Sequence, residues 1–378
     1  MMMRTEGYRL MNALLSTAVI SLMVTTGWSQ TLTWLGTLGG NWSYASAVSA
    51  DGSVVVGRAY YAAGQYRAFR WTPATGMQDL GTLGGDSSVA QSVSADGSVV
   101  VGGASNAAGY IRAFRWTPAT GMQDLGTLGG GGGVAYGVSA DGSVVVGGAP
   151  NAAWQYRAFR WTQATGMQDL GTLGGNSSVA WSVSADGSVV VGGALNAAWQ
   201  YRAFRWTQAT GMQDLGTLPG GDRSYAYAVS ADGSVVVGEA LNAAWQKRAF
   251  RWTQATGMQD LGTLPGGDYS VAWSVSADGS VVVGWARNAA GQYRAFRWTV
   301  SHGMEDLNIT YASLLTNGSW LEWAHAISPD GRYIVGRGWN AATGGYEGFL
   351  LDTVPEPASL MALGAGLAGL LGLRRRKR

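Results

Sequence analysis

The chain of 378 residues contains no cysteine, so an exported form of it would be held together by packing and backbone hydrogen bonds and not by disulfides. It has only two histidines, and only 13% of its residues are charged. Because the chain has no thiol and only two imidazoles, it offers few candidate nucleophiles and general bases for nucleophilic catalysis. Glycine (59 residues) and tryptophan (18) are abundant instead, and because the glycines follow no collagen period, the composition is typical of a turn-rich β protein.

Positive charge is scarce outside the two ends of the chain. The formal net charge is +2, but Arg4, Arg9 and the five basic residues 374–378 lie in terminal segments. With those residues, Glu6 and Glu356 set aside, 18 Lys and Arg face 21 Asp and Glu, a net charge of about −3. A weakly acidic body has no electrostatic footprint for nucleic acid, so we expect no nucleic-acid partner.

The first thirty residues have the charged, apolar, small-residue order of a secretory signal peptide. Arg4 and Arg9 precede an apolar run from Leu10 to Val24, and small and polar residues continue to Gln30. We therefore predict a signal peptide over residues 1–30. An uncleaved N-terminal anchor is the alternative.

The other end of the chain has three parts in a fixed order. Pro355, Glu356 and Pro357 precede sixteen uncharged, mostly apolar residues, 358–373, and the chain stops at the basic tail 374–378. The apolar run is shorter than the ~20 residues that span a bilayer comfortably, and the basic tail is expected to stay on the cytoplasmic side. We predict a sorting signal over 354–378 with a transmembrane segment at 358–373. A simple C-terminal anchor is the alternative.

This arrangement resembles the PEP-CTERM sorting signal of Gram-negative bacteria. The resemblance implies export across the inner membrane, an exosortase as processing partner, and a final place in the cell envelope, on the surface or in the extracellular matrix. The family is associated with exopolysaccharide and biofilm, so exopolysaccharide or other surface proteins become expected partners.

The body of the chain is one sequence repeated. Ala-Asp-Gly recurs six times, and a seventh, diverged copy reads Ser328-Pro329-Asp330-Gly331. The repeated aspartates are Asp51, Asp96, Asp141, Asp186, Asp232, Asp278 and Asp330. A fixed period of about 45 residues indicates a solenoid, a propeller or an array.

Each unit is predicted to form four short strands. In the first unit one strand ends at Val48, and the next, Ser53 to Gly57, follows a tight Asp51-Gly52 turn. The third is Arg67 to Thr72 and the fourth Met77 to Leu83. The valine triplet of the second strand does not alternate with polar residues, which indicates burial on both faces of the sheet.

The ends of the repeat region complement each other. Residues 31–38 have the sequence of a fourth strand without its predecessors, and the last unit stops after a third strand, 348–352. We predict an all-β fold over residues 31–353, a β-propeller of seven four-stranded blades closed by the N-terminal strand, with apolar helical segments at both termini. Other repeat folds, such as an open solenoid, are the alternative.

The repeats resemble the HAF family of probable extracellular repeats through their Ala-Asp-Gly-Ser-Val-Val-Val-Gly and Ala-Phe-Arg-Trp elements. The resemblance covers almost the whole body and implies a surface location. Arg67 stands where the family has histidine, and the last unit has Glu347-Gly348-Phe349, so a role attached to that histidine does not carry over.

Repeated polar residues favour scaffold over chemistry. Each Asp of an Asp-Gly pair stands alone in its hairpin, so a turn explains it better than a calcium site. The recurring pairs Arg70 with Asp79, Arg115 with Asp124 and Arg160 with Asp169 are interpreted as cross-strand ion pairs. We expect no catalytic residue, no metal and no cofactor. A Ser–His–carboxylate site near Glu322 and His325 stays an unanchored alternative.

Two positions differ between units and are candidate binding positions. The first lies five residues before each repeated Asp, after an invariant alanine, and if the first strand is innermost it circles the propeller axis. Sugar stacking and packing between blades are both open interpretations there. The residues are Ser46, Gln91, Tyr136, Trp181, Tyr227, Trp273 and His325.

The second variable position lies in the loop before the third strand. Three consecutive units carry Trp154, Trp199 and Trp245 there, and the units on either side have glycine. Aromatic rings on one edge could stack on sugars or anchor a partner, whereas each ring could also cap its own blade.

These observations favour an exported, surface- or matrix-associated protein with a non-enzymatic structural or adhesive role. Its proposed ligand-binding candidates are Trp154, Trp199, Trp245, Tyr136, Trp181, Tyr227 and Trp273. A carbohydrate-active enzyme on a propeller and an inert surface spacer are the alternatives.

Overall fold

The computed structural model describes residues 30–61 and 64–353, and almost all regular structure in them is β. The predicted signal peptide and the sorting signal with its apolar segment lie outside these residues. The helical elements of the described part are α2 (Leu307–Thr310) and η1 (Ala312–Leu314). None of its helices is long and apolar enough to cross a membrane.

Strands recur in groups of four, one group for each complete sequence unit. They are β1 (Thr31–Trp34); β2 (Gly39–Val48), β3 (Val55–Tyr61), β4 (Tyr66–Thr72), β5 (Gly76–Asp79); β6 (Gly84–Val93), β7 (Val100–Asn106), β8 (Ile111–Thr117), β9 (Gly121–Asp124); β10 (Val134–Val138), β11 (Val144–Pro150), β12 (Tyr156–Thr162), β13 (Gly166–Asp169); β14 (Gly174–Val183), β15 (Val189–Asn196), β16 (Tyr201–Thr207), β17 (Gly211–Asp214); β18 (Ser224–Val229), β19 (Val235–Leu241), β20 (Lys247–Thr253), β21 (Gly257–Asp260); β22 (Ser270–Val275), β23 (Val281–Arg287), β24 (Tyr293–Thr299), β25 (Gly303–Asp306); and β26 (Trp320–Ile327), β27 (Tyr333–Asn340), β28 (Gly345–Asp352).

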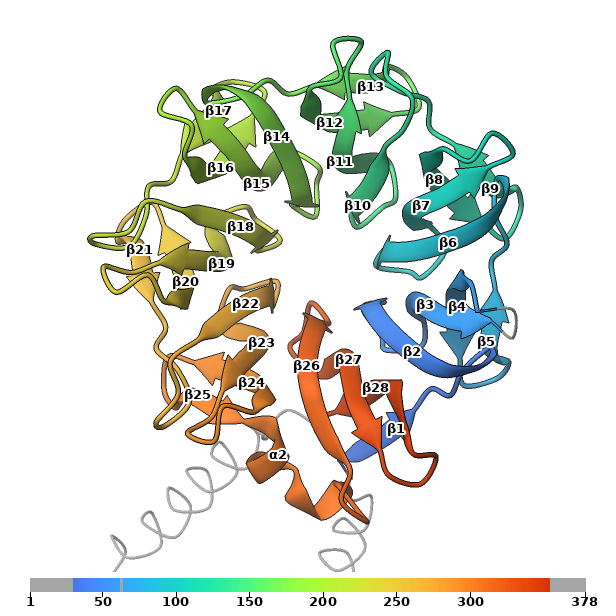
Figure 1. The fold of residues 1–378 in the computed structure, drawn as a ribbon, viewed down its shortest axis with the longest axis vertical. Helices are drawn as coiled ribbons and strands as arrows, with labels where there is room; N and C mark the ends of the chain where they lie inside the picture. The colour runs from blue at the N-terminus through green and yellow to red at the C-terminus, as the bar shows by residue number, and fades with distance from the viewer. Residues whose placement is uncertain (1–29, 62–63, 354–378) are drawn as a thin grey trace, which may run out of the picture.

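The sheets are arranged in a ring, with the first strand of each unit nearest the centre (Figure 1). Five units form separate antiparallel four-stranded sheets. The first unit and the last share an eight-stranded sheet, in which β1 pairs with β28 and a single parallel bridge, Trp42 to Tyr346, joins β2 to β28. The fold is therefore all-β and propeller-like.

The Asp-Gly segments are longer connections than predicted. Val48 pairs with Val55, so residues 49–54 lie between the strands. Asp51 Oδ1 accepts hydrogen bonds from the Ser53 backbone N–H (2.9 Å) and from the Ser49 and Ser53 hydroxyls (2.7 Å each). The aspartate thus organises a wider turn in place of a two-residue hairpin, and the prediction that it is a turn residue fits this geometry.

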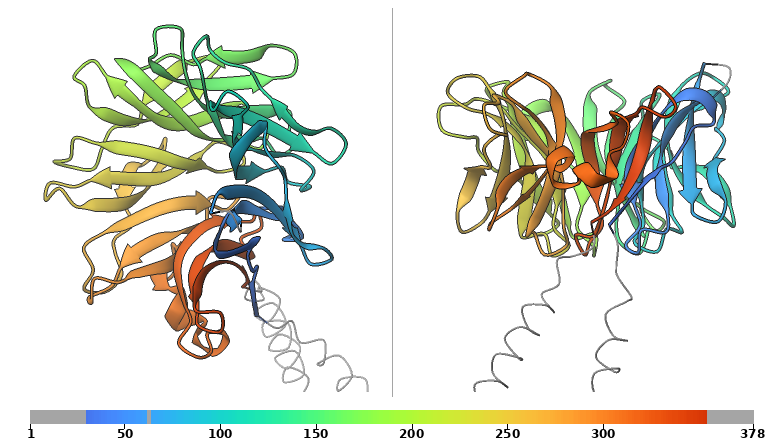
Figure 2. Two further views of the ribbon diagram at one scale, coloured as in Figure 1. Left: turned by 45° about the vertical axis from the view of Figure 1, so that its right-hand side comes forward. Right: turned by 90° about the horizontal axis from the view of Figure 1, so that it is seen from below.

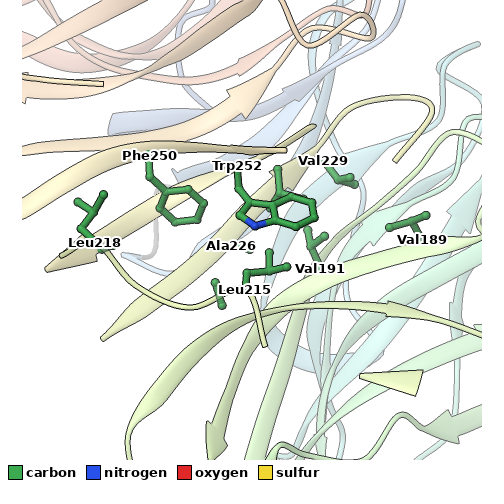
Figure 3. Close-up of a cluster of buried hydrophobic side chains, with 11 residues drawn as sticks. Val189, Val191, Leu215, Leu218, Ala226, Val229, Phe250 and Trp252 are labelled. Carbon is green, nitrogen blue, oxygen red and sulfur yellow. The ribbon is translucent and has the colours of Figure 1, made fainter. Parts of the chain in front are cut away.

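The core lies between neighbouring sheets. In one cluster Val54, Val56 and Ala68 of the first unit pack against Val100 and Phe114 of the second, and all five are 4% exposed or less. Figure 3 shows the equivalent cluster between the fourth and fifth units. The valine triplets are therefore covered on both faces, as predicted. Truncating one of the repeated phenylalanines would cost about 3–5 kcal/mol.

The predicted pairing of Arg70 with Asp79 is wrong, because the two side chains lie on opposite faces of the sheet. Arg70 lies opposite Gln78, whereas Asp79 lies opposite Phe69, so Asp79 shares its face with Arg67. The observed pairs are Arg67–Asp79, Arg112–Asp124, Arg157–Asp169, Arg202–Asp214, Arg248–Asp260 and Arg294–Asp306, with N–O distances of 3.0–3.9 Å.

The second arginine of the repeat holds neighbouring units together instead. Arg115 Nε donates to the Gly142 carbonyl and Arg160 Nε to the Gly187 carbonyl, each at 3.4 Å. Each acceptor belongs to the Asp-Gly turn of the next unit, so this contact joins one sheet to the next.

Candidate functional site: a central cavity and a row of exposed tryptophans

The first variable position lines one cavity at the centre of the ring. Its volume is about 470 Å³, within the range of small-molecule sites. All seven predicted residues contribute to its lining: Ser46, Gln91, Tyr136, Trp181, Tyr227, Trp273 and His325. The alanine before each of them is fully buried against the sheet, as strand alternation predicts.

A β-bulge aims these side chains. The register between β2 and β3 shifts from Ala45 to Ala47, across Ser46. Each of the remaining units has a register shift at the equivalent step. An extra residue in one strand bends it and redirects its side chain. The bulge also explains the glycine after each valine triplet, because a Cβ on Gly192 would collide with the Val179 carbonyl oxygen.

The aromatic members of the lining contact one another in series. Tyr227 stacks on Trp273 with ring centroids 4.5 Å apart, and Trp273 stacks on His325 at 4.7 Å. Trp181 meets Tyr227 edge-on at 5.1 Å, and Tyr44 meets His325 edge-on at 4.6 Å. The cavity is therefore asymmetric, with an aromatic arc from the fourth unit to the first and polar Ser46 and Gln91 elsewhere. The same rings therefore pack between units and line the cavity.

The charge of the cavity comes from one arginine. Arg58 lines it, and its guanidinium carbon lies 5.4–5.6 Å from the ring centroids of Trp42, Tyr44 and Tyr66. Burial, and secondarily Arg337, lowers the pKa of Arg58, which an arginine tolerates while staying charged. Burial and then Arg337 also lower the pKa of His325 to about 3, so this imidazole is neutral at physiological pH.

A second cavity of about 340 Å³ adjoins the first and shares Trp181 and Tyr227 with it. Glu239 lies in its wall, 3.1 Å from Lys247 Nζ. Burial and the charge of Glu239 raise the pKa of Tyr227 well above its ordinary value, so the phenol stays protonated. The single carboxylate is thus committed to an ion pair and to a phenol.

In the alternative prediction of a Ser–His–carboxylate site, the carboxylate is Glu322, and this side chain is already paired with Arg337. Glu322 Oε2 accepts a hydrogen bond from Arg337 Nε at 2.9 Å. Within the described residues, no group of three or more His, Asp or Glu side chains is placed to hold a metal ion.

Trp154, Trp199 and Trp245 are the most exposed aromatic rings of the described chain, at 72%, 67% and 66%. Each has a positive φ, 58°, 60° and 59°, a region that side-chain-bearing residues rarely adopt. The Asn151 side chain shapes the loop by accepting hydrogen bonds from the Ala153 and Gln155 N–H groups (2.9 and 3.0 Å). The equivalent positions Gly64, Gly109 and Gly291 have the same sign of φ, whereas in the last unit Thr343 stands at this spacing and the positive φ belongs to Gly344.

These tryptophans lie on the face opposite the two ends of the described part, residues 30 and 353. The Trp154 loop joins Pro150 to Tyr156, at the far end of β11 from its Asp-Gly turn. The described ends lie at the turn face, because Thr31 pairs with Asp352, which also pairs with Tyr333 beside the Asp330 turn. Figure 2 shows β1 and β28 side by side there.

The central cavity is also lined by Arg58, Tyr44 and Trp323, which the sequence pattern did not predict. A signal for them exists, because the residue after each Val-Val-Val-Gly varies as well. Tyr44 opposes Arg58 and Trp323 opposes Arg337, whereas Val89 opposes Gly103 in a unit without the bulky pair.

The sequence model of the PEP-CTERM protein-sorting motif matches residues 353–377. This motif is a recognition signal for exosortase processing and indicates export to the cell envelope or surface of a Gram-negative bacterium. Pro355, Glu356 and Pro357 lie within the match and outside the described residues. Comparison with curated protein sequences gives no match.

Solved structures share the fold. The β-propeller domain of the Trilobed protease from Pyrococcus furiosus superposes with a TM-score of 0.51 at 10% identity, over 82% of this chain and 96% of that one. A chain from a study of two prolyl endopeptidases gives 0.51 at 12%, over 94% of this chain and 57% of that one. A putative TolB from Agrobacterium tumefaciens gives 0.44 at 14%, over 59% and 82%. At these identities the first two likenesses show a propeller-like fold and nothing about activity.

Proposed function

We propose that this protein is a non-enzymatic adhesive module that is displayed at the envelope and binds exopolysaccharide through Trp154, Trp199 and Trp245. The observation that carries the proposal is their combination of exposure and strained backbone at a position where three other units have glycine. A surface location agrees with the sorting motif and with the HAF-like repeats.

The backbone conformation argues against an incidental role. A left-handed conformation costs a residue with a Cβ roughly 1–2 kcal/mol, which glycine avoids. Large exposed apolar rings add a solubility cost. Three consecutive units bear both costs, and the apolar faces of pyranose rings are natural stacking partners for indoles.

The position of the loops agrees with display. If the sorting tail holds the turn face toward the envelope, the opposite face with the tryptophans points away from the cell. We further infer that the ring comprises seven blades closed by β1. The support is the antiparallel register of β1 on β28, from Thr31–Asp352 to Trp34–Phe349.

The test is co-sedimentation of the full chain with exopolysaccharide extracted from its host. The variant carries Trp154→Gly, Trp199→Gly and Trp245→Gly, which reproduces the loops of the other units and should fold at least as well. Ile309→Ala, at an apolar residue 78% exposed on α2, is the matched control. We expect saturable binding that only the triple variant loses. No binding by the unmodified chain, or full binding by the triple variant, would contradict the proposal.

A further inference from the structure

We propose that the central cavity is a second binding site, separate from the tryptophan row, and that it takes a sugar bearing a carboxylate, of the uronic acid type. The features that carry this proposal are an arginine without an anionic partner, two indole N–H groups without acceptors, and a wall of stacked rings.

Arg58 is a cation whose guanidinium has no anionic partner among the described residues. Its Nε is buried and has no hydrogen-bond partner in the described part of the chain. Arg337, the other arginine beside these rings, is neutralised by Glu322, but none of the ion pairs found in residues 30–61 and 64–353 includes Arg58. Trp42, Tyr44 and Tyr66 fix the guanidinium from several sides, so little side-chain freedom remains to be lost on binding.

The cavity wall offers further donors. Trp273 Nε1 and Trp323 Nε1 are buried, and neither has an acceptor among the described residues. Both residues line the same cavity as Arg58. A buried N–H without a partner costs about 1–3 kcal/mol, so a ligand whose acceptor draws the N–H toward the cavity by a small shift of the ring would recover that free energy.

No negative charge in the wall opposes an anion. Among the described residues that line this cavity there is no Asp or Glu, and Arg58 is the only permanently charged one. His325 faces the cavity as a neutral imidazole that can donate one hydrogen bond and accept another. A carboxylate is therefore favoured over a cationic or neutral group of the same size.

The rings favour a sugar over a small inorganic anion. Trp181, Tyr227 and Trp273 form a continuous aromatic surface in the wall. Because Tyr227 and His325 stack on the Trp273 ring, this surface presents ring edges, which suit the C–H groups and hydroxyls of a pyranose. Ser46 and Gln91, elsewhere in the lining, supply hydroxyl and amide partners for the remaining sugar hydroxyls. A volume of about 470 Å³ accommodates one or two sugar rings but not a folded chain.

The experiment is isothermal titration calorimetry of the full chain in a sugar-free detergent with three probes. The probes are a galacturonic acid trimer, the neutral galactose trimer, and phthalate as an aromatic anion that is not a sugar. We expect saturable binding of the galacturonic acid trimer at least tenfold tighter than that of either other probe. Arg58→Gln should weaken it by roughly 10- to 100-fold, the usual range for a hydrogen bond to a charged group.

Further variants keep the test specific. Trp273→Phe and Trp323→Phe keep an aromatic ring, a phenyl in place of the indole, and remove the N–H, and each should weaken binding several-fold. Arg112→Gln removes an arginine that pairs with Asp124 away from the cavity, and binding should be unchanged. The triple tryptophan-to-glycine variant should bind the trimer normally, which separates this site from the adhesive one.

Three results would overturn the proposal. They are no saturable binding of the galacturonic acid trimer, equal binding of the galactose trimer, and binding unaffected by Arg58→Gln in a protein that still folds. Phthalate binding as tight as that of the trimer would overturn the assignment to a sugar.

Discussion

Trp199 shows how a single side chain conflicts with its own backbone. It holds φ at 60° with 67% of the residue exposed, so little packing offsets the strain. We expect Trp199→Gly to leave the free energy of unfolding unchanged or raise it by up to about 1 kcal/mol, because relief of strain competes with the extra freedom of glycine in the unfolded chain. Urea denaturation measures the change.

Trp199→Ala is the matched control, since it removes the ring but keeps a Cβ in the left-handed region. It should not stabilise the protein. A loss of more than 1 kcal/mol in Trp199→Gly would show that the ring packs against its own unit, which would weaken the adhesive interpretation.

His325 predicts a pH dependence of stability. Its pKa is lowered from 6.5 to about 3, so between these pH values the unfolded chain binds a proton on this imidazole and the folded chain does not. The stabilisation is complete above pH 6.5 and is lost as the pH falls toward 3, with a slope of at most about 1.4 kcal/mol per pH unit. Urea unfolding at pH 7.5 and 4.5 should show a smaller loss in His325→Gln than in the unmodified protein. Equal losses would mean that the imidazole is protonated in the folded state.

Sequence comparison between units identifies the residues that line the cavity, because their position varies between invariant neighbours. It also separates Trp154 from the glycines of other units. It cannot show that Arg58 lacks a carboxylate partner, because that depends on Arg337 meeting Glu322 across β26 and β27. Internal repetition reveals where units differ, but only the fold reveals which different residues meet.

The bulge in each first strand is the element that builds the cavity, and it depends on one glycine per unit. A Cβ on Gly102 would collide with the Val89 carbonyl oxygen and crowd the Phe114 ring. We expect Gly102→Ala to cost at least about 1–3 kcal/mol, because backbone must move to make room. Thermal unfolding followed by circular dichroism measures the loss.

The neighbouring glycine is the control for that prediction. A Cβ on Gly103 would lie 3.1 Å from Ile111 Cγ2 and 3.2 Å from Val134 Cγ2, and these side chains need to move by only a few tenths of an ångström. Other units carry Arg58, Glu239 or Trp285 at this position. Gly103→Ala should therefore cost clearly less than Gly102→Ala, and equal losses would contradict the role given to the bulge.

The strands could be predicted from local sequence patterns, whereas the turn length and the ion-pair partners depend on the register between strands and were predicted wrongly. The valine triplets and the Ala-Phe-Arg-Trp elements form strands as predicted. The Asp51 connection is wider than a two-residue turn, since Ser49 and Ser53 hydrogen bonds to the aspartate hold extra residues out of the strands. The partner of Asp79 is Arg67 and not Arg70, because a one-residue difference in register exchanges the two faces.

At the scale of the whole molecule, the junction between the last unit and the first differs from the others. Backbone N–H groups donate to the next turn in a series that starts with Ala50 to Ala95 (2.9 Å) and ends with Ala277 to Pro329 (2.9 Å). Pro329 has no N–H to continue the series to the first unit. The contacts of β1 with β28, including Trp34 edge-on to Phe349 at 6.4 Å, join the two units where this hydrogen bond is missing.

Covalent closure at that junction tests its importance, and the absence of cysteine makes the experiment clean. Thr33 and Leu350 are paired across β1 and β28, so a disulfide between Thr33→Cys and Leu350→Cys would close a loop of roughly 320 residues. The control joins Val189 and Thr207, a pair within one internal sheet, and closes a loop of roughly 20 residues.

On loop-entropy grounds the junction disulfide should stabilise the protein by about 2–3 kcal/mol more than the control. The measurement is the difference in unfolding free energy between oxidised and reduced forms of each variant. If β1 closes the ring, the Thr33–Leu350 disulfide forms without strain and shows this excess. Failure of the disulfide to form, or stabilisation no larger than that of the control, would mean that the ring stays open between its first and last units.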